Sequence, residues 1–358
     1  MKTKKLFCIF ILPLILFFSC SKEPGLTVKL LTDGNGINDK SYNAKAWQGI
    51  LQFYNEEWGN EKYFGTLYDI IPCPEPEQRT STLRQISEGH PDLIIITSFL
   101  FSGSIQYIAP VFPEQKYLCI DSNYYGYPNV SNYLFASEEG SFLVGAAAAL
   151  CARKDDIQYP AFGFIGGIES DIIADFEAGF IQGVRYILPD SQILVHYVND
   201  WEKPELAAKT TKEWYDAGVY AVYSAAGASG NGTIAQAVAH RKTGKNVWAI
   251  GVDSDQYEEG IFGVGKSAVL TSMVKNIDIA ILAGMNHVEK GTFTGGSVII
   301  GLKENGVGFT TTNPDLKDDV VKRLSSIRSD IISGKIKVAA TYKDRAKVSE
   351  ILKTVKVE

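Results

Sequence analysis

The residues best placed to bind or transform a small molecule are polar ones that directly follow short apolar runs. Seven such positions occur along the chain: Asp33, Ser98, Asp121, Gly166-Gly167, Asn199-Asp200-Trp201, Ala226-Gly227 and Asp253. Ligands of open α/β sheets bind beyond the carboxyl ends of the strands, so these residues are predicted to meet at one site. The set offers carboxylates, glycines and a ring face but no pair of nucleophile and base, which favours binding over catalysis.

Two short motifs resemble nucleotide-binding or catalytic signatures. Residues 260–267 have the spacing G-x-x-x-x-G-K-S of a phosphate-binding loop. Such a loop opens a helix, whereas residues 268–273 have the composition of a strand, so we interpret the match as chance. Residues 227–231 resemble a nucleophile elbow, but Asn231 stands where the second glycine belongs. We interpret this segment as a glycine-rich turn that approaches a ligand.

Short apolar runs alternate with amphipathic stretches over more than 200 residues. The runs, predicted as buried parallel strands, are 26–31, 92–96, 117–120, 161–165, 192–198, 219–223 and 247–252. The stretches, predicted as helices, are 43–54, 78–88, 172–188, 204–217 and 231–241. This alternation predicts an α/β fold of doubly wound parallel sheets, and the length suggests about two domains. We expect the lobe to change near 135–139, with crossings back after Asp253 and again after His287.

The N-terminus predicts export. Three lysines within the first five residues precede an apolar run at 6–18 that is too short to span a bilayer, so 1–19 is predicted to be a signal peptide. A serine directly before Cys20 fits the cleavage site of a bacterial lipoprotein, so we expect lipidation of Cys20 and a linker at 20–25. Ordinary signal cleavage, with Cys20 an incidental cysteine, is the alternative. The lipidated form would face the periplasm or the cell exterior on a lipid anchor at the cell membrane.

Charge and composition exclude several classes of protein. The net charge is -6, and loss of the signal's lysines makes it more negative, so binding to nucleic acid is disfavoured. Three cysteines remain after Cys8 and Cys20, and both Cys119 and Cys151 lie in apolar surroundings, so we expect no disulfide framework. The four histidines lie tens of residues apart. We therefore expect neither a metal site nor a cofactor.

A series of longer motifs runs in order along the chain. They are TD at 32–33 with NDKSYN at 38–43, EGSFLVG at 139–145, GFIGG at 163–167, FEAGF at 176–180, AAG at 225–227 with GNG at 230–232, IGVDSDQY at 250–257 and TSMVK at 271–275. Together they resemble the basic membrane lipoprotein family of PnrA-like substrate-binding lipoproteins, whose best-understood members are similar to purine-nucleoside receptors of ABC importers.

The resemblance covers essentially the whole chain after the signal. It implies a type I periplasmic-binding-protein-like fold, with two lobes joined by three hinge crossings. With the crossings placed as above, the first lobe is expected at 26–136 plus 254–291, and the second at 137–253 plus 292–358.

The resemblance also implies roles for individual residues. The purine would lie between the rings of Tyr42 and Trp201, one from each lobe. Asp33 and Asp121 would form hydrogen bonds at the purine edge, and Asp253 would hold the vicinal ribose hydroxyls.

Four further residues complete the implied binding set. Gly227 would let the backbone approach the ligand, Lys275 would donate a hydrogen bond to the sugar, and Asn38 and Ser98 would line the site. Because a phosphate would meet several carboxylates, nucleosides are expected to be preferred to nucleotides.

Three of these positions depart from the usual family pattern. Tyr42 and Trp201 stand where phenylalanine is common, and Asn38 stands where aspartate is common. Stacking is expected to survive both aromatic changes, but the larger indole and the added hydroxyl alter pocket size and base preference.

The sequence therefore predicts a lipid-anchored substrate-binding protein, not an enzyme, that binds purine nucleosides of the inosine, guanosine and adenosine class. Hinge closure around the ligand would present the closed form to an ABC permease in the membrane. One alternative is an exported binding lipoprotein for another small polar ligand, such as a sugar or a riboflavin-like ring. Another is a surface lipoprotein that acts as an adhesin or antigen. An enzyme, either a nucleoside hydrolase or an ATPase, is the more distant possibility.

Overall fold

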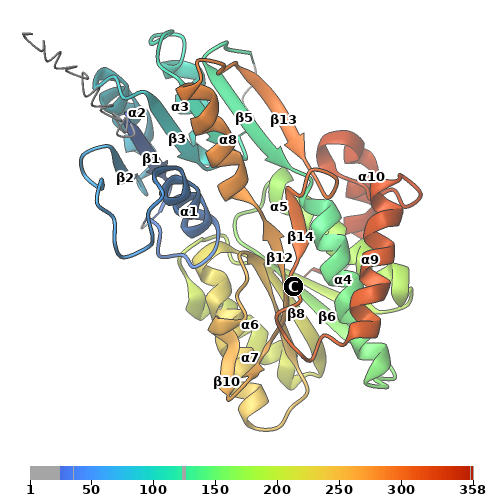
Figure 1. Cartoon of the computed structure of the whole chain (residues 1–358). Coiled ribbons are helices and arrows are strands. Elements are labelled where there is room, and N and C mark those ends of the chain that lie inside the picture. Colours follow the sequence, from blue (N-terminus) through green and yellow to red (C-terminus); the bar gives the residue numbers. More distant parts are fainter. Residues whose placement is uncertain (1–24, 35, 123–125, 355, 358) are drawn as a thin grey trace, which may run out of the picture.

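Two large β-sheets, one above the other in Figure 1, form the framework of the protein. The computed structural model describes residues 25–34, 36–122, 126–354 and 356–357. The first sheet has the order β13-β5-β4-β3-β1-β2 and comprises β1 Val28–Thr32, β2 Tyr68–Pro72, β3 Leu93–Thr97, β4 Tyr117–Ile120, β5 Val130–Phe135 and β13 Gly296–Ile300. The second has the order β14-β12-β9-β8-β6-β7-β15 and comprises β6 Ala161–Gly166, β7 Gln192–Tyr197, β8 Val219–Ala225, β9 Trp248–Asp253, β12 Val269–Lys275, β14 Val307–Phe309 and β15 Lys356–Val357. All strand pairs in both sheets are parallel except β12 with β14.

Helices cover both faces of the first sheet because its strands are apolar on both faces. Leu30 of β1 packs in the same core as Trp47 of α1 (Tyr42–Tyr54) and Ile281 of α8 (Ile277–Glu289). Its neighbour Leu31 points the other way and packs with Leu83 of α2 (Arg79–Glu88) and with residues of α3 (Ser102–Ile108). Successive residues of a strand face opposite sides, so a continuous apolar run requires this double cover.

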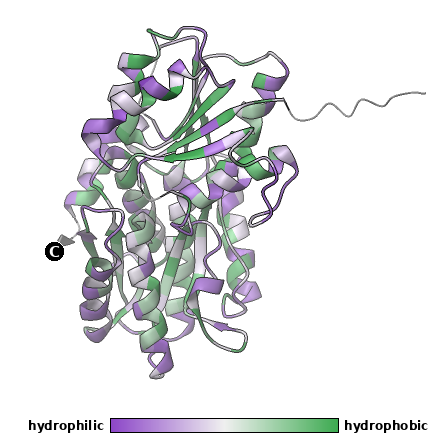
Figure 2. Cartoon of the chain, turned by 90° about the vertical axis from the view of Figure 1, so that its left-hand side faces the viewer, coloured by the Kyte–Doolittle hydropathy of each residue, from purple (hydrophilic) through white to green (hydrophobic). Residues whose placement is uncertain are grey.

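The second sheet is built in the same way. Phe164 of β6 packs on the side of α4 (Ser137–Lys154) and α5 (Asp171–Ile187), whereas Ile165 packs on the side of α6 (Pro204–Asp216) and α7 (Asn231–Lys242). Helices α9 (Asp318–Ile332) and α10 (Thr341–Lys353) pack against α4 and α5. Figure 2 shows the result, with hydrophobic colour concentrated in the strands and hydrophilic colour on the outer helices. The predicted α/β fold of parallel sheets flanked by helices is confirmed.

The chain passes between the two sheets three times. It leaves the first sheet after Phe135, returns after Lys275 and leaves again after Ile300. This differs from the expected division, which gave 254–291 to the first lobe and 292–358 to the second. Strand β12 pairs with β9 in the second sheet, and β13 pairs with β5 in the first, so the returning segment is 277–300.

The displaced crossing has a physical cause. After β9 the chain forms a short turn, η4 (Glu258–Gly260), and a hairpin of β10 (Ile261–Gly263) and β11 (Lys266–Ser267), and then re-enters the same sheet as β12. The strand β12 is buried, so it belongs inside the second sheet. The hairpin also contains the G-x-x-x-x-G-K-S spacing, and because a strand rather than a helix follows it, our interpretation of that motif as chance is confirmed.

Glycines let α4 and α5 pack with their backbones nearly in contact. A Cβ added at Gly145, Gly179 or Gly183 would lie 2.0 to 2.4 Å from a backbone oxygen of the other helix. No side chain can avoid a rigid backbone atom at that distance. The helix pair that begins at the first crossing therefore depends on these three glycines.

We expect Gly183→Ala to destabilise the protein by about 3 kcal/mol, because α4 and α5 would have to separate. The measurement is guanidinium unfolding followed by circular dichroism. Gly103→Ala, near the start of α3, is the matched control, since nothing lies within 4 Å of its added Cβ. An unfolding midpoint for Gly183→Ala equal to that of Gly103→Ala would contradict the proposed backbone contact.

The cysteines of the described residues agree with the expectation of no disulfide framework. Cys73, Cys119 and Cys151 are all buried and free. No helix within the described ranges is long and apolar enough to cross a membrane. The predicted signal peptide and lipidated Cys20 lie outside the described residues.

Candidate ligand-binding site

A cavity of about 380 Å³ lies between the two sheets, lined by residues from both lobes. All nine residues of the predicted ligand-binding set line it: Asp33, Asn38, Tyr42, Ser98, Asp121, Trp201, Gly227, Asp253 and Lys275. Its size falls at the lower end of the range typical of small-molecule sites. Five other strand-end residues that were predicted to meet at the site are not among the lining residues: Gly166, Gly167, Asn199, Asp200 and Ala226. The structure therefore brings the nine-residue binding set together at one place but not every strand-end residue.

Strand ends position most of these side chains. Asp33, Ser98 and Asp121 directly follow β1, β3 and β4, and Asp253 and Lys275 end β9 and β12. Asp121 and Asp253 adopt left-handed backbone conformations, with φ of 54° and 64°. Aspartate is one of the few residue types besides glycine that tolerate this region, which turns the chain sharply at the sheet edge.

A buried ion pair crosses from one lobe to the other. Lys275 Nζ lies 2.6 Å from Asp121 Oδ2, and the two residues are only 1% and 5% exposed. The ammonium also lies 5.4 Å from the ring centroid of Tyr42 and 4.9 Å from that of Phe176. Aromatic faces attract a cation, so these rings add to the attraction that Asp121 exerts on the ammonium group.

Asp253 is the least satisfied carboxyl group of the site. Its Oδ1 atom is buried and has no hydrogen-bond partner among the described residues. Burial raises its pKa to about 7; Lys275 opposes this shift, whereas Asp121 and Asp39 add to it. A buried acceptor without a partner is costly, so this oxygen is available for a donor from a ligand.

A second carboxyl group faces the cavity from the end of β1. Burial raises the pKa of Asp33, and a hydrogen bond from the Ser98 side chain and the charge of Arg79 partly offset that effect. Ser98 itself is 5% exposed, and its hydroxyl also accepts a hydrogen bond from the Leu100 amide at 3.1 Å. Two of the predicted residues thus form one polar unit.

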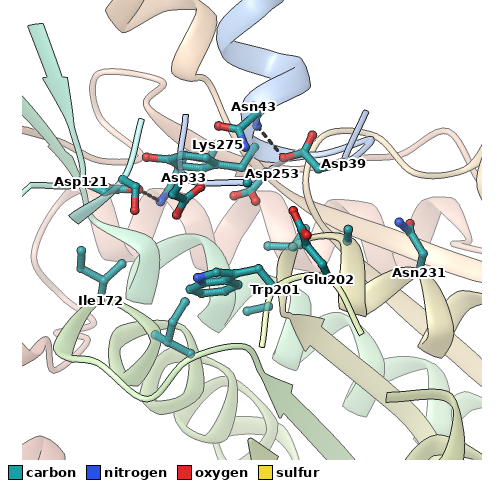
Figure 3. A pocket seen from close by; sticks show the side chains of 18 of the residues that line it. Asp33, Asp39, Asn43, Asp121, Ile172, Trp201, Glu202, Asn231, Asp253 and Lys275 are labelled. Atoms are coloured by element: carbon teal, nitrogen blue, oxygen red, sulfur yellow. Dashed lines mark hydrogen bonds and ion pairs between the residues drawn. The ribbon is translucent and has the colours of Figure 1, made fainter. Parts of the chain in front are cut away.

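The two predicted aromatic side chains come from opposite lobes. Tyr42 is the first residue of α1, and its hydroxyl donates to the Ile120 carbonyl at 3.3 Å. Trp201 lies between β7 and α6, with its ring against Gly167, where an added Cβ would lie 2.0 Å from the indole. Phe99 meets Trp201 edge to face, with ring centroids 6.5 Å apart and planes at 75°. Figure 3 shows the indole on one side of the cavity and Asp33 and Asp253 on the other.

Gly227 and Asn38 occupy the margins of the site. Gly227 opens the tight turn η3 (Gly227–Gly230) between β8 and α7 with φ of 56°, and Trp201 is its nearest neighbour in the cavity. This agrees with the interpretation of 227–231 as a glycine-rich turn and not a nucleophile elbow. Asn38 is exposed at the edge of the lining.

Sequence reasoning missed several lining residues. Asp39, Phe99 and Glu202 each stand next to a predicted residue, and that adjacency was the available signal. Asp39 accepts hydrogen bonds from the amides of Ser41, Asn43 and Ala44 at 2.7 to 3.1 Å and so caps α1. The other missed residues include Ile172, Ile173 and Phe176 of α5, and Asn231 at the start of α7.

The lobes also touch beside the cavity. Lys40 Nζ of the first lobe lies 2.5 Å from Glu259 Oε2 of the second, and the Ser254 hydroxyl donates to the Ser41 carbonyl at 3.2 Å. A Cβ built on Gly34 would lie 2.4 Å from Glu202 Oε1, so the glutamate reaches across to the first lobe. These contacts hold the two halves of the cavity together.

The side chains of the lining are of a few chemical kinds. Within the described part of the chain, no group of three histidine, cysteine or acidic side chains is arranged to hold a metal ion. The lining combines carboxyl groups, aromatic rings and one lysine. Two α/β lobes that are joined by three crossings and share such a cavity define a two-lobed solute-binding protein.

The comparison with known families is specific. Residues 26–342 match the family described as ABC transporter substrate-binding protein PnrA-like, and the chain belongs to this family. It is therefore a substrate-binding protein of the ABC transporter type and not an enzyme. The resemblance derived from the sequence motifs is confirmed.

Similar proteins support this assignment. The CD4+ T-cell-stimulating antigen of Listeria monocytogenes is 31% identical over 320 residues, which cover 87% of each chain. The ABC transporter nucleoside-binding protein BmpA of Lactococcus lactis is 29% identical and covers 87% of this chain and 89% of that protein. A solved ABC transporter solute-binding protein from Aeropyrum pernix has a TM-score of 0.80 at 25% identity, with coverage of 92% of this chain and 96% of that chain.

Proposed function

We propose that the protein binds purine nucleosides in the cavity between its lobes and delivers them to an ABC importer from a lipid anchor at Cys20. The observation that carries the proposal is the combination of Asp253 with two aromatic side chains in one cavity. Asp253 offers an unpartnered buried oxygen, and Tyr42 and Trp201 come from opposite lobes.

The carboxyl group of Asp253 suits a ribose. Two neighbouring hydroxyls can each donate to one oxygen of a carboxylate, and such charge-assisted hydrogen bonds are stronger than neutral ones. In this protein the residue Asp253 is 6% exposed, so the hydrogen bonds would form away from water. Asp33 and the Asp121–Lys275 pair would meet the polar edge of the base or the sugar.

The rings suit a flat base. A base that stacks on an aromatic side chain gains about 1 to 3 kcal/mol, largely independent of its identity. Because one ring comes from each lobe, the full stack forms only when the lobes are closed, and ligand would shift the population towards the closed state. The closed form is the one we propose the permease recognises.

One relative supports the nucleoside as the ligand, and the N-terminal sequence supports the lipid anchor. The Lactococcus lactis relative is named as a nucleoside-binding protein. The apolar segment at 6–18 and Cys20 have the pattern of a lipoprotein signal, and they lie outside the described residues. We therefore propose that the protein lies at the cell membrane and faces the periplasm or the cell exterior.

Calorimetry against inosine, guanosine, adenosine, a pyrimidine nucleoside, ribose and riboflavin tests the proposal. We expect the purine nucleosides to bind, and Trp201→Ala to weaken that binding by about tenfold to a hundredfold through lost stacking. Trp201→Phe is expected to restore most of the affinity.

Tyr159→Ala is the matched control, because Tyr159 is 96% exposed and does not line the cavity. Binding of ribose or riboflavin alone would favour the exported binding protein for another polar ligand. Absence of binding to every compound would favour the adhesin or antigen alternative.

A further inference from the structure

The side chains that line the cavity carry much more negative than positive charge. Among the described lining residues, Lys275 is the only one with a cationic side chain, whereas the acidic ones are Asp33, Asp39, Asp121, Glu202 and Asp253. Lys275 is already paired with Asp121 at 2.6 Å. At a pH where these carboxyl groups are ionised, the cavity therefore holds more negative charge than its own lysine balances.

Two of the acidic side chains have partners that account for their charge. Asp121 has the lysine, and Asp39 accepts three backbone amides at the start of α1, where the helix dipole favours an anion. Among the described residues, Asp33 and Asp253 form no ion pair of their own, although the charges of Arg79 and Lys275 act on them from beyond ion-pair distance. Asp33 accepts a hydrogen bond from the neutral hydroxyl of Ser98, and Asp253 keeps a buried oxygen without a hydrogen-bond partner.

The acidic groups repel one another across the cavity. Asp121 and Asp39 both raise the pKa of Asp253, and Asp39 raises that of Asp33. In a buried site such repulsion is weakly screened by salt, so a positive charge placed between these groups would be stabilised by all of them.

The aromatic lining adds a second attraction for a cation. Trp201 lies across the cavity from Asp33 and Asp253 in Figure 3. Of the aromatic side chains, tryptophan binds a cation most strongly over its face. A flat cationic ring in this space would have a π face on one side and carboxyl groups near its edge.

We propose that the site prefers purine nucleosides whose base carries a positive charge, such as N7-alkylated purine nucleosides, over neutral purine nucleosides of the same shape. The proposal rests on the proposed function and names a narrower ligand class for the same cavity. The positive charge of an N7-alkylated base is spread over its five-membered ring, so it faces Trp201 and the carboxyl groups at once.

The test is calorimetry of the mature full chain with three ligands: adenosine, N7-methyladenosine and 7-deaza-7-methyladenosine. The last has the same shape as N7-methyladenosine but a neutral base, so it separates charge from size. The experiment is done at about pH 8, above the pKa of about 7 of Asp253, and N7-methyladenosine stays cationic there because its base has no ring N–H proton to lose. We expect the cation to bind about tenfold more tightly than its neutral isostere.

Three variants separate the two sources of the preference. Trp201→Leu removes the π face and Asp33→Asn removes one negative charge, so each is expected to lower the ratio of the two affinities. Asp190→Asn removes an exposed charge between α5 and β7, outside the cavity, and is expected to leave the ratio unchanged.

The outcomes distinguish this inference from the proposed function. If adenosine bound and the affinities for N7-methyladenosine and its neutral isostere were equal, the charge preference would be overturned and nucleoside binding would remain intact. Tighter binding of the neutral isostere than of the cation would likewise overturn the charge preference and leave nucleoside binding intact. If none of the three ligands bound, both the preference and the proposed function would be wrong.

Discussion

Replacing Asp253 with asparagine is expected to weaken guanosine binding by about a hundredfold, since two charge-assisted hydrogen bonds of about 1.5 kcal/mol each become neutral or are lost. The substitution keeps the shape of the side chain and the left-handed backbone, which asparagine also tolerates. The loss of affinity would therefore be due to the missing carboxylate and not to a changed backbone at the end of β9. Calorimetry with Asp190→Asn as the control measures it, and an unchanged affinity would remove Asp253 from the sugar site.

The same residue predicts how binding depends on pH. The pKa of Asp253 is raised to about 7, and its ionised form is the better acceptor for ribose hydroxyls. Affinity of the unmodified protein is thus expected to rise as the pH passes upward through about 7, with proton release on binding below that pH. The Asp253→Asn protein would lack this dependence.

The stability of the ligand-free protein is expected to fall as the pH rises, whereas the affinity for ligand rises. Because the pKa of Asp253 in the folded state is about 7, above the ordinary 3.8, the folded protein holds this proton more tightly than the unfolded chain. The contribution of this proton to the free energy of unfolding is full below pH 3.8, the ordinary pKa, and is lost as the pH rises through about 7, the pKa in the folded state. Asp253→Asn is therefore expected to increase stability most in alkaline buffer, by at least about 1 kcal/mol. Urea unfolding across this pH range measures the effect; identical pH profiles for the two proteins would contradict it.

Lys275→Met is expected to destabilise the protein by about 3 to 5 kcal/mol. Methionine fills much of the same volume but leaves Asp121 buried, with no cation to balance its charge. Guanidinium unfolding at neutral pH measures the loss. Lys266→Met is the control, because Lys266 is exposed in the β10–β11 hairpin.

A double variant shows whether the ion pair causes the loss. Asp121→Asn combined with Lys275→Met removes both buried charges, so the double variant is expected to be more stable than Lys275→Met alone. If the two changes were simply additive, the destabilisation would come from packing and not from an unpaired carboxylate.

Much of the site could be predicted from the sequence because one rule of parallel sheets applied at several strands. Asp33, Ser98 and Asp121 follow buried strands and Asp253 ends one, and the carboxyl ends of those strands face the same cleft. The rule failed at the end of β6, where Gly166 and Gly167 do not line the cavity. The roles of Tyr42 and Lys275 came instead from the family resemblance. Neither role can be inferred from the residues that flank Tyr42 or Lys275 in the sequence.

The parts that were missed depend on tertiary packing. Phe176 lines the cavity from the middle of α5, and which face of a helix meets a cleft is decided only when the helix docks. The second and third crossings were misplaced because β12 and β13, the strands before and after α8 in the chain, belong to different sheets. An apolar run predicts a strand but not the sheet that it joins.

The burial of the three free cysteines makes the protein convenient for fluorescence work. Burial raises the pKa of Cys119 and Cys151, which keeps these thiols from the thiolate form that reacts with maleimides. In a chain that starts after Cys20, a cysteine introduced at Glu259 would be the fast-reacting thiol. A dye attached there would sit beside Lys40 where the lobes meet, so its emission would report opening and closing without replacement of any native cysteine.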